Sequence, residues 1–418
     1  MINTFSCDNF RNVSVDGIAF KKINLLIGPN NSGKTNFIRA LTFYSNILKH
    51  ASEGNLQTDF YNALWRNGWG HTLKHGQNSG TPISFSWNLD LGKEPVDFKF
   101  SYVTGREKME DYRIVLEELN AKPNERYESV FNFFQAHKPI QGMGKISTGT
   151  RLGQENKRLS FSLNSGATIC SQFNNILLQN KELYDSTVIR EDIAGLMNSL
   201  QEAFRSVFAY SSARINTKAI RQPVDSTLIS NFLMDDASNF ISAFHYYKGN
   251  KLSWKLDFVE YMKDMMHEIK DVDIVNTFNQ NMIRIVMKDG EFDLSDVSEG
   301  TIKALVLNFL INMPVEHKYT LLAIDEPENN LHPAWQKVLG DWISESDNYE
   351  QCVISTHSPD LLDTFTEGFK NDEVGLFVFS FDGKVDQVQY SELSEWIDDC
   401  ELGDLYRTDH PSIGGWPW

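Results

Sequence analysis

The sequence is poor in cysteine and in positive charge, and it has no long apolar run. Its four cysteines are scattered over 418 residues, which argues against a disulfide framework and against a zinc site. No apolar segment is long enough to span a bilayer, and the N-terminus lacks a basic-then-apolar signal segment, so we expect a cytoplasmic protein with no membrane partner. No sustained heptad repeat is present, and a long coiled coil is therefore not expected.

Acidic residues outnumber basic ones by 56 to 39, and the formal net charge is −17. A protein that coats nucleic acid by itself is usually basic, because its affinity comes largely from neutralising phosphates. The charge argues against sequence-independent DNA coating as the main activity, although it leaves room for a local basic groove. It agrees at least as well with a protein whose main partner is another protein.

Residues 28–35 read Gly-Pro-Asn-Asn-Ser-Gly-Lys-Thr, the pattern of a phosphate-binding loop. The apolar run at 22–27 has the composition of a buried parallel strand, and the apolar residues after the loop follow a helical spacing. In that context the backbone N–H groups and the helix dipole point at a phosphate, whereas the bland alternative is a glycine-rich turn without a ligand. We expect a catalytic Lys34 that reaches the β- and γ-phosphates of ATP, and a Thr35 hydroxyl that ligates Mg²⁺. The expected nucleotide-binding residues of this segment are Gly28, Asn30, Asn31, Ser32, Gly33, Lys34, Thr35 and Asn36.

Chemically active side chains also follow two later apolar runs. The run at 319–324 is followed by Asp325 and Glu326, and the run at 352–356 by His357. Ligands of open α/β sheets bind at the carboxyl ends of strands, so we expect Asp325 to bind Mg²⁺, directly or through water. Glu326 would orient and polarise the attacking water, and His357 would sense the γ-phosphate. The alternatives are an acidic turn and a satisfied surface or core histidine, and the phosphate loop in the same chain favours the functional interpretation.

Ser298-Glu299-Gly300 precedes a helix that we expect over 301–311. A hydroxyl and exposed N–H groups at a helix start form an anion site, but the same residues also make a simple N-cap. One nucleotide held by the phosphate loop does not need a second anion site nearby. The site makes sense if it closes over a nucleotide bound to another subunit.

The chain between these motifs has a different pattern. Residues 83–102 alternate between apolar and polar, which predicts an antiparallel hairpin with one buried face. Residues from about 170 to 285 are mostly helical in pattern, and Asp271 and Asp273 are interpreted as a solvated turn. Asp382-Gly383 predicts a hairpin with a tight type I′ turn. The expected domains are an ATPase core at 1–48 and 290–418, a β-rich subdomain at 49–170 and a mainly helical insertion or lid at 171–289, with helices over 193–208, 228–247 and 258–269.

Five motifs follow one another in a recognisable order. After the phosphate loop and Ser-Glu-Gly come Ile-Asp-Glu-Pro-Glu at 324–328, Leu-His-Pro at 331–333 and Ser-Thr-His-Ser-Pro at 355–359. Together they resemble the ABC-type ATPases of the overcoming-lysogenization-defect (OLD) and SMC-like branch. Asn9-Phe10-Arg11 is similar to the start of the DNA-repair members. Leu402–Tyr406 with Gly414-Gly415 is similar to stand-alone prokaryotic members, many of them in anti-phage systems of the Septu, Gabija and PARIS kind.

The resemblance covers about 1–48 and 290–418, and it implies an α/β fold. The fold would have an ABC-type P-loop NTPase core, an antiparallel β subdomain and a helical insertion. The resemblance also implies a homodimer or higher homo-oligomer in which Ser298 and Gly300 contact the γ-phosphate in trans. Residues 328–331 would lie along the dimer interface, and Arg11 would approach the base. The glutamine that usually links Mg²⁺ to the helical lobe is not assigned; the candidates are Gln57 and Gln77.

Three functions agree with these patterns. The first is a dimeric ATPase, converting ATP and water to ADP and phosphate, that switches a separate effector such as a nuclease or toxin in anti-phage defence. Longer OLD nucleases carry a Toprim domain of about a hundred residues; only 61 residues follow His357 here, so no nuclease site is expected. The second is a DNA-repair or recombination ATPase that binds DNA directly, which the negative charge disfavours. The third, a transporter ATPase, is disfavoured by Leu-His-Pro and the large middle insert.

Overall fold

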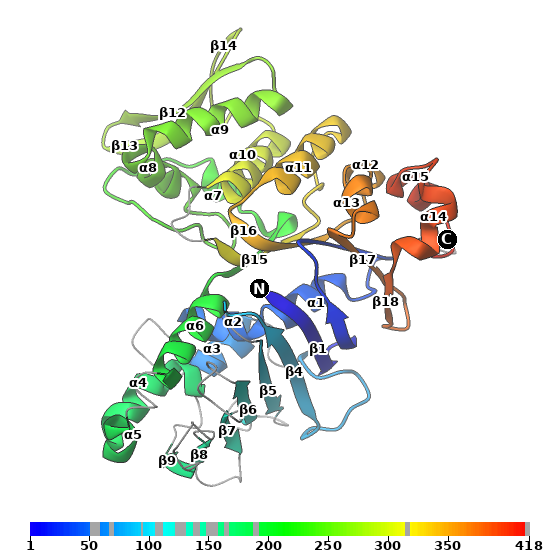
Figure 1. The fold of residues 1–418 in the computed structure, drawn as a ribbon. Coiled ribbons are helices and arrows are strands. Elements are labelled where there is room, and N and C mark those ends of the chain that lie inside the picture. The colour runs from blue at the N-terminus through cyan, green and yellow to red at the C-terminus, as the bar shows by residue number, and fades with distance from the viewer. Residues whose placement is uncertain are drawn as a thin grey trace. The chain divides into compact units, whose positions relative to one another are not determined.

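The protein is seen in a computed structural model (Figure 1), and the chain divides into two compact units. The first unit comprises 1–21, 29–208 and 379–387, and the second comprises 22–28, 209–378 and 388–418. The structure describes residues 1–50, 59–66, 71–92, 95–104, 112–121, 131–136, 143–147, 158–162, 167–186, 192–313 and 318–413.

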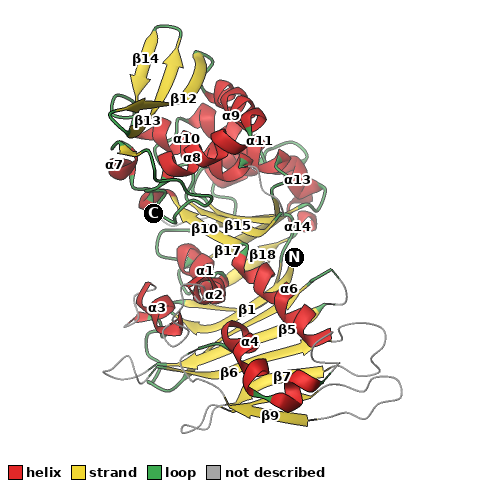
Figure 2. Ribbon diagram, turned by 90° about the vertical axis from the view of Figure 1, so that its left-hand side faces the viewer, coloured by secondary structure: helices red, strands yellow, loops and turns green. Residues whose placement is uncertain are grey.

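The first unit is built on an eight-stranded antiparallel sheet (Figure 2), with the order β2-β1-β4-β5-β6-β7-β8-β9. The hairpin predicted at 83–102 is confirmed as β4 and β5, in which Phe85 pairs with Phe100 and Trp87 with Phe98. The strands are β1 (Ile2–Phe10), β2 (Val13–Ala19), β4 (Pro82–Leu89), β5 (Val96–Val103), β6 (Arg113–Ala121), β7 (Phe131–Ala136), β8 (Met143–Ser147) and β9 (Arg158–Ser162).

One face of this sheet carries an aromatic core. Because side chains alternate along β4 and β5, their rings all point to the same side, where helices pack on them. Phe43 stacks on Phe85 and Tyr102 with ring centroids 5.2 and 5.3 Å apart, and Tyr44 meets Phe98 edge-on at 4.6 Å. The helices of this unit are α1 (Lys34–Leu41), α2 (Phe43–His50), α3 (Asp59–Arg66), α4 (Ile169–Gln179), α5 (Lys181–Asp185) and α6 (Ala194–Arg205).

A buried carboxyl group lies within this core. Glu117 accepts hydrogen bonds from the Tyr44 hydroxyl at 2.7 Å and from the backbone N–H groups of Ile169 and Cys170 at 2.7 and 3.1 Å. The last two are at the N-terminus of α4, where the helix dipole favours an anion. Burial nevertheless raises the pKa of Glu117 to about 7, and the three hydrogen bonds only partly oppose that rise.

The second unit contains a buried parallel sheet whose central order is β15-β16-β3-β17. The apolar runs before the phosphate loop, the acidic pair and His357 are confirmed as strands β3 (Ile23–Ile27), β15 (Tyr319–Asp325) and β16 (Tyr349–Ser355). The register places Asp325 beside Ser355 and Ser355 beside Leu26. The carboxyl ends of these three strands therefore meet at one edge. The sheet also includes β10 (Val207–Ser211), β17 (Val374–Phe379) and β18 (Val385–Val388).

Helices and a small antiparallel sheet complete the second unit. Phe244, Trp254, Phe258 and Phe309 form an aromatic cluster among α8, α9 and α10. The helices are α7 (Thr217–Ile220), α8 (Phe240–Asn250), α9 (Leu252–Met265), α10 (Glu299–Asn312), α11 (Pro333–Glu345), α12 (Pro359–Asp363), α13 (Thr366–Lys370), α14 (Tyr390–Ile397) and α15 (Leu402–Arg407), with the 3₁₀ turn η5 (Ser212–Arg214). The small sheet contains β11 (Val224–Asp225), β12 (Ile269–Thr277), β13 (Gln280–Met287) and β14 (Gly290–Asp293).

Two of the helices predicted in the middle of the chain are wrong in part. The helix expected over 228–247 begins only at Phe240, and the residues before it form a loop. In that loop the Asn239 amide donates to the carbonyl of Phe232 at 2.9 Å and accepts from the N–H of Met234 at 2.9 Å. The helix expected over 258–269 ends at Met265, because Ile269 begins β12.

The interpretation of Asp271 and Asp273 as a solvated turn is also wrong. Both lie on β12, where Lys255 pairs with each of them and Lys248 pairs with Asp273. The alternating burial along β13, with Ile283 and Ile285 inward, is the strand period that the helical interpretation missed. The strands β12 and β13 form an antiparallel ribbon within the segment predicted to be helical.

The turn at Asp382-Gly383 differs from the prediction as well. A type I′ turn needs positive φ at both central residues, but here Gly383 has φ 81° and Asp382 is not in the positive-φ region. Asp382 instead accepts a hydrogen bond from the Ser380 hydroxyl at 2.6 Å, and Ser380 N–H donates to the carbonyl of Lys384 at 3.0 Å. The hairpin itself, β17 with β18, is confirmed.

The predicted α/β class is confirmed, because a parallel sheet, antiparallel sheets and helices are all present. Within the described residues, no helix is both long enough and apolar enough to cross a bilayer.

Candidate functional site

The loop after β3 has the backbone conformation of a phosphate cradle. Gly28, Asn31 and Gly33 have φ values of 145°, 65° and 114°. Gly33 is the N-cap residue of α1 and supplies no side-chain cap to the first turn of N–H groups. A Cβ at Gly33 would lie 3.2 Å from the Asn12 amide nitrogen, so both φ and space favour glycine there. The uncapped helix start suits an anion.

Two side chains of this loop are buried and polar. The Lys34 ammonium donates to the carbonyl of Pro29 at 3.0 Å, which holds it over the loop. The Ser32 hydroxyl is buried and has no hydrogen-bond partner among the described residues. A buried polar atom without a partner costs free energy, and a phosphate oxygen would supply the missing partner. The loop therefore fits the phosphates of a nucleotide.

Asn12 holds the phosphate loop from the side, a contact that the sequence did not indicate. Its amide donates to the carbonyl of Asn31 at 3.1 Å and accepts from the Asn36 side chain at 2.7 Å. It lies in the tight turn between β1 and β2, next to Arg11, which has φ 55° and a guanidinium 5.9 Å from the Phe10 ring centre. The turn thus brings Arg11 into the same unit and vicinity as Asn31, while its contact with a base remains a prediction.

Asp325 is fixed through both carboxylate oxygens. The Ser355 hydroxyl donates to one oxygen at 2.5 Å and the Ser211 hydroxyl to the other at 3.3 Å. These serines lie at the ends of β16 and β10, the two strands that flank β15. A buried, oriented carboxylate suits a hard cation, so Asp325 is the residue at this sheet edge that would hold Mg²⁺, while the role of Thr35 remains a prediction. When bound, the ion would neutralise negative charge on the phosphates.

Glu326 and His357 lie together at the same sheet edge. Glu326 has φ 51°, and its N–H donates to the Ser355 carbonyl at 3.0 Å and hydroxyl at 3.1 Å. The Asn329 amide donates to one oxygen of the Glu326 carboxylate at 2.8 Å, and His357 Nε2 lies 3.8 Å from the other. A carboxylate held between an amide and an imidazole can orient a water molecule. Asn329 is a further residue that the motif alone did not reveal.

Glu328 fixes the backbone of the histidine. One of its carboxylate oxygens accepts from the N–H of His357 at 2.7 Å, and the other is buried without a partner in the part of the chain that the structure describes. Burial raises the pKa of Glu328 to about 7 against the lowering effect of that N–H, and the nearby Glu326 charge adds to the rise. Glu328 thus ties the acidic segment to the strand end that carries His357.

Ser298 and Gly300 lie beside the segment that follows the acidic pair. Ser298 is the N-cap residue of α10, which was one of the two interpretations of this segment. Its hydroxyl accepts a hydrogen bond from the N–H of Thr301 at 3.1 Å. A Cβ on Gly300 would lie 2.4 Å from the carbonyl oxygen of Asn330, so a side chain there would displace one of the two segments. Contact of Ser298 and Gly300 with a nucleotide in trans remains a prediction.

The last residue of β10 and the first residue of η5 contact the acidic pair and the segment that follows it. The Ser212 hydroxyl donates to the carbonyl of Asn329 at 3.4 Å, next to the Ser211 contact with Asp325. Gln77 lies in a turn in which its N–H donates to the carbonyl of Lys74 at 3.1 Å. The other candidate glutamine, Gln57, and the pair Gly414-Gly415 lie outside the described residues.

A sequence model of the AAA ATPase domain family matches residues 1–362. The chain belongs to this family. The matched range includes the phosphate loop, Ser298, the acidic pair and His357, and it ends one residue before the end of α12. The ATPase assignment therefore rests on nearly the whole chain, with α13, α14 and α15 beyond the match.

Two curated relatives share sequence with this family member. "Endonuclease GajA" of Bacillus cereus (strain VD045) is 22% identical over 374 residues, which is 85% of this chain and 55% of the relative. "Retron Vc95 probable ATPase" of Vibrio cholerae serotype O1 biovar El Tor is 31% identical over 118 residues, which is 26% of this chain and 23% of the relative. The chain thus spans about half the length of the first and a quarter of the second.

Among solved structures, the chain is similar to "Crystal structure of the SmcHead bound to the C-winged helix domain of ScpA". The match has a TM-score of 0.46 and 13% sequence identity, and it covers 94% of this chain and 99% of that chain.

Proposed function

We propose that the protein is an ATP-hydrolysing switch that works as a homodimer or higher homo-oligomer and regulates a separate effector in prokaryotic anti-phage defence. The observation that carries the proposal is the convergence of β3, β15 and β16. Their carboxyl ends place the start of the phosphate loop, the acidic pair and His357 at one sheet edge. ATP is the expected ligand and Mg²⁺ the expected metal.

The proposed roles follow from the contacts. Lys34 and the N–H groups of α1 would hold the phosphates, and Glu326 would accept a proton from the attacking water. His357, whose Nε2 lies 3.8 Å from Glu326, would sense the γ-phosphate by hydrogen bonding to it. Ser298 and Gly300 would complete the site of a second copy, as the resemblance to the OLD and SMC-like branch implies. Nucleotide-dependent pairing would then be a ligand-biased two-state change.

The defence role is supported by the relatives, one named an endonuclease and the other a retron probable ATPase. Because this chain spans only part of each, their activities and partners are proposals here. A neighbouring gene for a nuclease or toxin would support the effector. DNA-stimulated hydrolysis with a steep salt dependence would instead support direct DNA binding.

Glu326→Gln tests the switch, because it keeps the shape of the side chain and removes its ability to take a proton. We expect the variant to form a larger species on size-exclusion chromatography with ATP and Mg²⁺, and to return to the nucleotide-free size when ATP is withdrawn. Lys34→Ala, which removes the phosphate contact, is the matched control and should show no such change. Single-turnover hydrolysis run alongside should be lost in both variants. The model would be falsified if Glu326→Gln kept its nucleotide-free size in ATP and Mg²⁺ and still hydrolysed ATP at the wild-type rate.

A further inference from the structure

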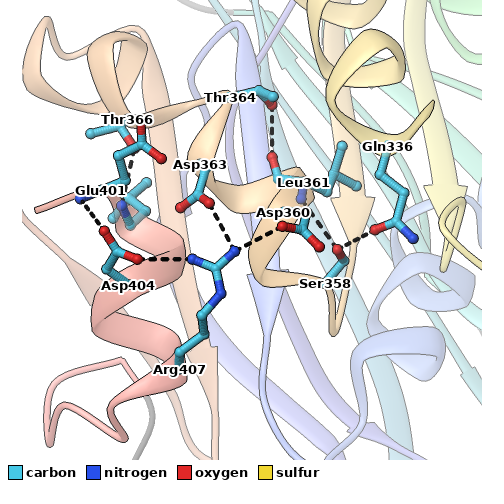
Figure 3. Close-up of polar contacts among 11 residues, drawn as sticks. Gln336, Ser358, Asp360, Leu361, Asp363, Thr364, Thr366, Glu401, Asp404 and Arg407 are labelled. Carbon is cyan, nitrogen blue, oxygen red and sulfur yellow. Dashed lines mark hydrogen bonds and ion pairs between the residues drawn. The ribbon is translucent and has the colours of Figure 1, made fainter. Parts of the chain in front are cut away.

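The helix α15 packs against α12, the short helix that follows His357 (Figure 3). Arg407 on α15 donates to Asp360 at 2.9 Å and to Asp363 at 3.0 Å, both on α12, and to Asp404 on its own helix at 2.9 Å. The Asp363 side chain is only 5% exposed. A buried carboxylate depends on its partner, so Arg407 is the group that makes this packing tolerable.

The backbone at Gly403 makes the approach of the two helices possible. A Cβ there would lie 2.2 Å from Asp363 Oδ1 and 2.2 Å from the carbonyl oxygen of Pro359, both on α12. Next to it, the N–H of Leu402 donates to the Thr366 hydroxyl at 3.0 Å. Leu402 and Gly403, together with Arg407, therefore make the contacts of α15 with α12 and the start of α13.

The position of α12 in turn sets the path of the chain at His357. Ser358 is the N-cap residue of α12 and accepts from the N–H of Leu361 at 3.2 Å. The same hydroxyl donates to the Gln336 side chain (Figure 3), whose amide donates to the carbonyl of Leu331 at 3.1 Å. A five-residue helix has little stability of its own, so its place is fixed by these contacts and by α15.

We propose that Gly403 and Arg407 are positioning residues for His357. By holding α12, they hold the backbone from which the imidazole reaches the Glu326 carboxylate. The inference rests on the proposed function, since the position of His357 matters for rate only if the site hydrolyses ATP. The matched family range ends at residue 362, so this positioning element lies beyond it.

A double-mutant cycle tests the inference. Arg407→Ala should lower kcat about tenfold, a size in the range for residues coupled through shared contacts. ATP affinity should stay within about twofold, because the phosphate loop is untouched. In a His357→Ala background the same change should cause little further loss. Arg407→Lys keeps the charge but not the forked geometry, so its kcat should lie between those of the wild type and Arg407→Ala. Glu367→Gln, which removes a surface ion pair on α13, is the matched control and should leave kcat unchanged.

A second readout does not depend on hydrolysis. Amide hydrogen exchange at 356–363 should rise in Arg407→Ala without nucleotide and stay at the wild-type level in Glu367→Gln. The inference is overturned if Arg407→Ala leaves amide exchange at 356–363 unchanged. It is also overturned if Arg407→Ala lowers kcat by the same factor in the wild type and in His357→Ala. If Arg407→Ala does not fold, Asp360→Asn repeats the cycle, because this carboxylate is one of three on Arg407 and is 34% exposed. A wild-type protein that binds but does not hydrolyse ATP overturns the proposed function, while the exchange experiment still decides whether α15 holds α12.

Discussion

Replacing Asn329 by alanine should slow hydrolysis while leaving nucleotide binding intact. Its amide nitrogen lies 2.8 Å from the Glu326 carboxylate, the group proposed to activate water. A hydrogen bond to a charged group contributes about 1.5–3 kcal/mol. The Glu326 side chain is 32% exposed, which favours the low end of that range or below, about 1–1.5 kcal/mol. Since about 1.4 kcal/mol corresponds to a factor of ten in rate, we expect a loss of about five- to thirteenfold.

The assay is single-turnover hydrolysis with protein in excess over ATP, so that product release does not mask the chemical step. ATP affinity is measured separately, and we expect it to change less than about twofold. Asn329→Asp should be slower still, because a second carboxylate would repel Glu326. Asn250→Ala, at the exposed end of α8, is the control for removing an asparagine amide.

A rate within twofold of wild type for Asn329→Ala would refute the reasoning. It would mean that the contact with Glu326 is not kept when the nucleotide is bound. A loss confined to ATP affinity would equally contradict it, because a residue that orients Glu326 acts on the transition state and not on the ground state.

Two further predictions concern packing and pH. Gly300→Ala places a Cβ 2.4 Å from the Asn330 carbonyl oxygen, so it should lower the thermal midpoint and prevent the ATP-dependent species of Glu326→Gln. Gly249→Ala, a change in α8 whose Cβ meets nothing within 4 Å, should not lower the midpoint and should leave that species intact. Equal melting of the two variants would contradict the packing argument. Burial raises the pKa of Glu117 from 4.5 to about 7. The contribution of its protonated form to the free energy of unfolding is therefore fully present below about pH 4.5. As the pH rises through 7 this contribution is lost, and the free energy of unfolding falls by about 3 kcal/mol. Denaturant unfolding between pH 5 and 8 should show this fall in the wild type, and Glu117→Gln should make the free energy of unfolding less dependent on pH. The same pH dependence in both proteins would contradict the raised pKa of Glu117.

The strands that carry the site were predictable because they are buried on both faces. β3 and β15 appear in the sequence as continuous apolar runs of strand length, each followed by polar residues that hydrophobicity cannot explain. Ser298 was predictable as an N-cap because capping is a local property. Local periodicity and local chemistry therefore gave the core sheet, the start of α10 and the candidate residues.

The segment before α8 was not predictable in the same way. Leu228, Ile229 and Phe232 make the segment look like part of an apolar helix, but in the structure they are 56%, 62% and 53% exposed. The loop is held by the Asn239 side chain, whose hydrogen bonds compete with helix formation and leave no periodic signal.

The supporting contacts of the site were hidden for another reason. Asn12 contacts Asn31, and Ser211 contacts Asp325 across 114 positions of the chain. Such pairs arise only when separate segments fold together, and a single sequence shows each partner merely as a polar residue near a strand end. The candidate site residues could therefore be found from local sequence patterns, whereas the side chains that hold them in place could not.

The helix α10 offers a measure of nucleotide affinity that needs no catalytic assay. Its residues 300–311 are all buried, so its later amides should exchange with solvent only when the whole protein unfolds. A ligand that binds the folded state alone slows such exchange by a factor of one plus its concentration over its Kd. Exchange at residues 304–311, followed against ATP concentration, would therefore yield Kd for wild type and for inactive variants on one scale.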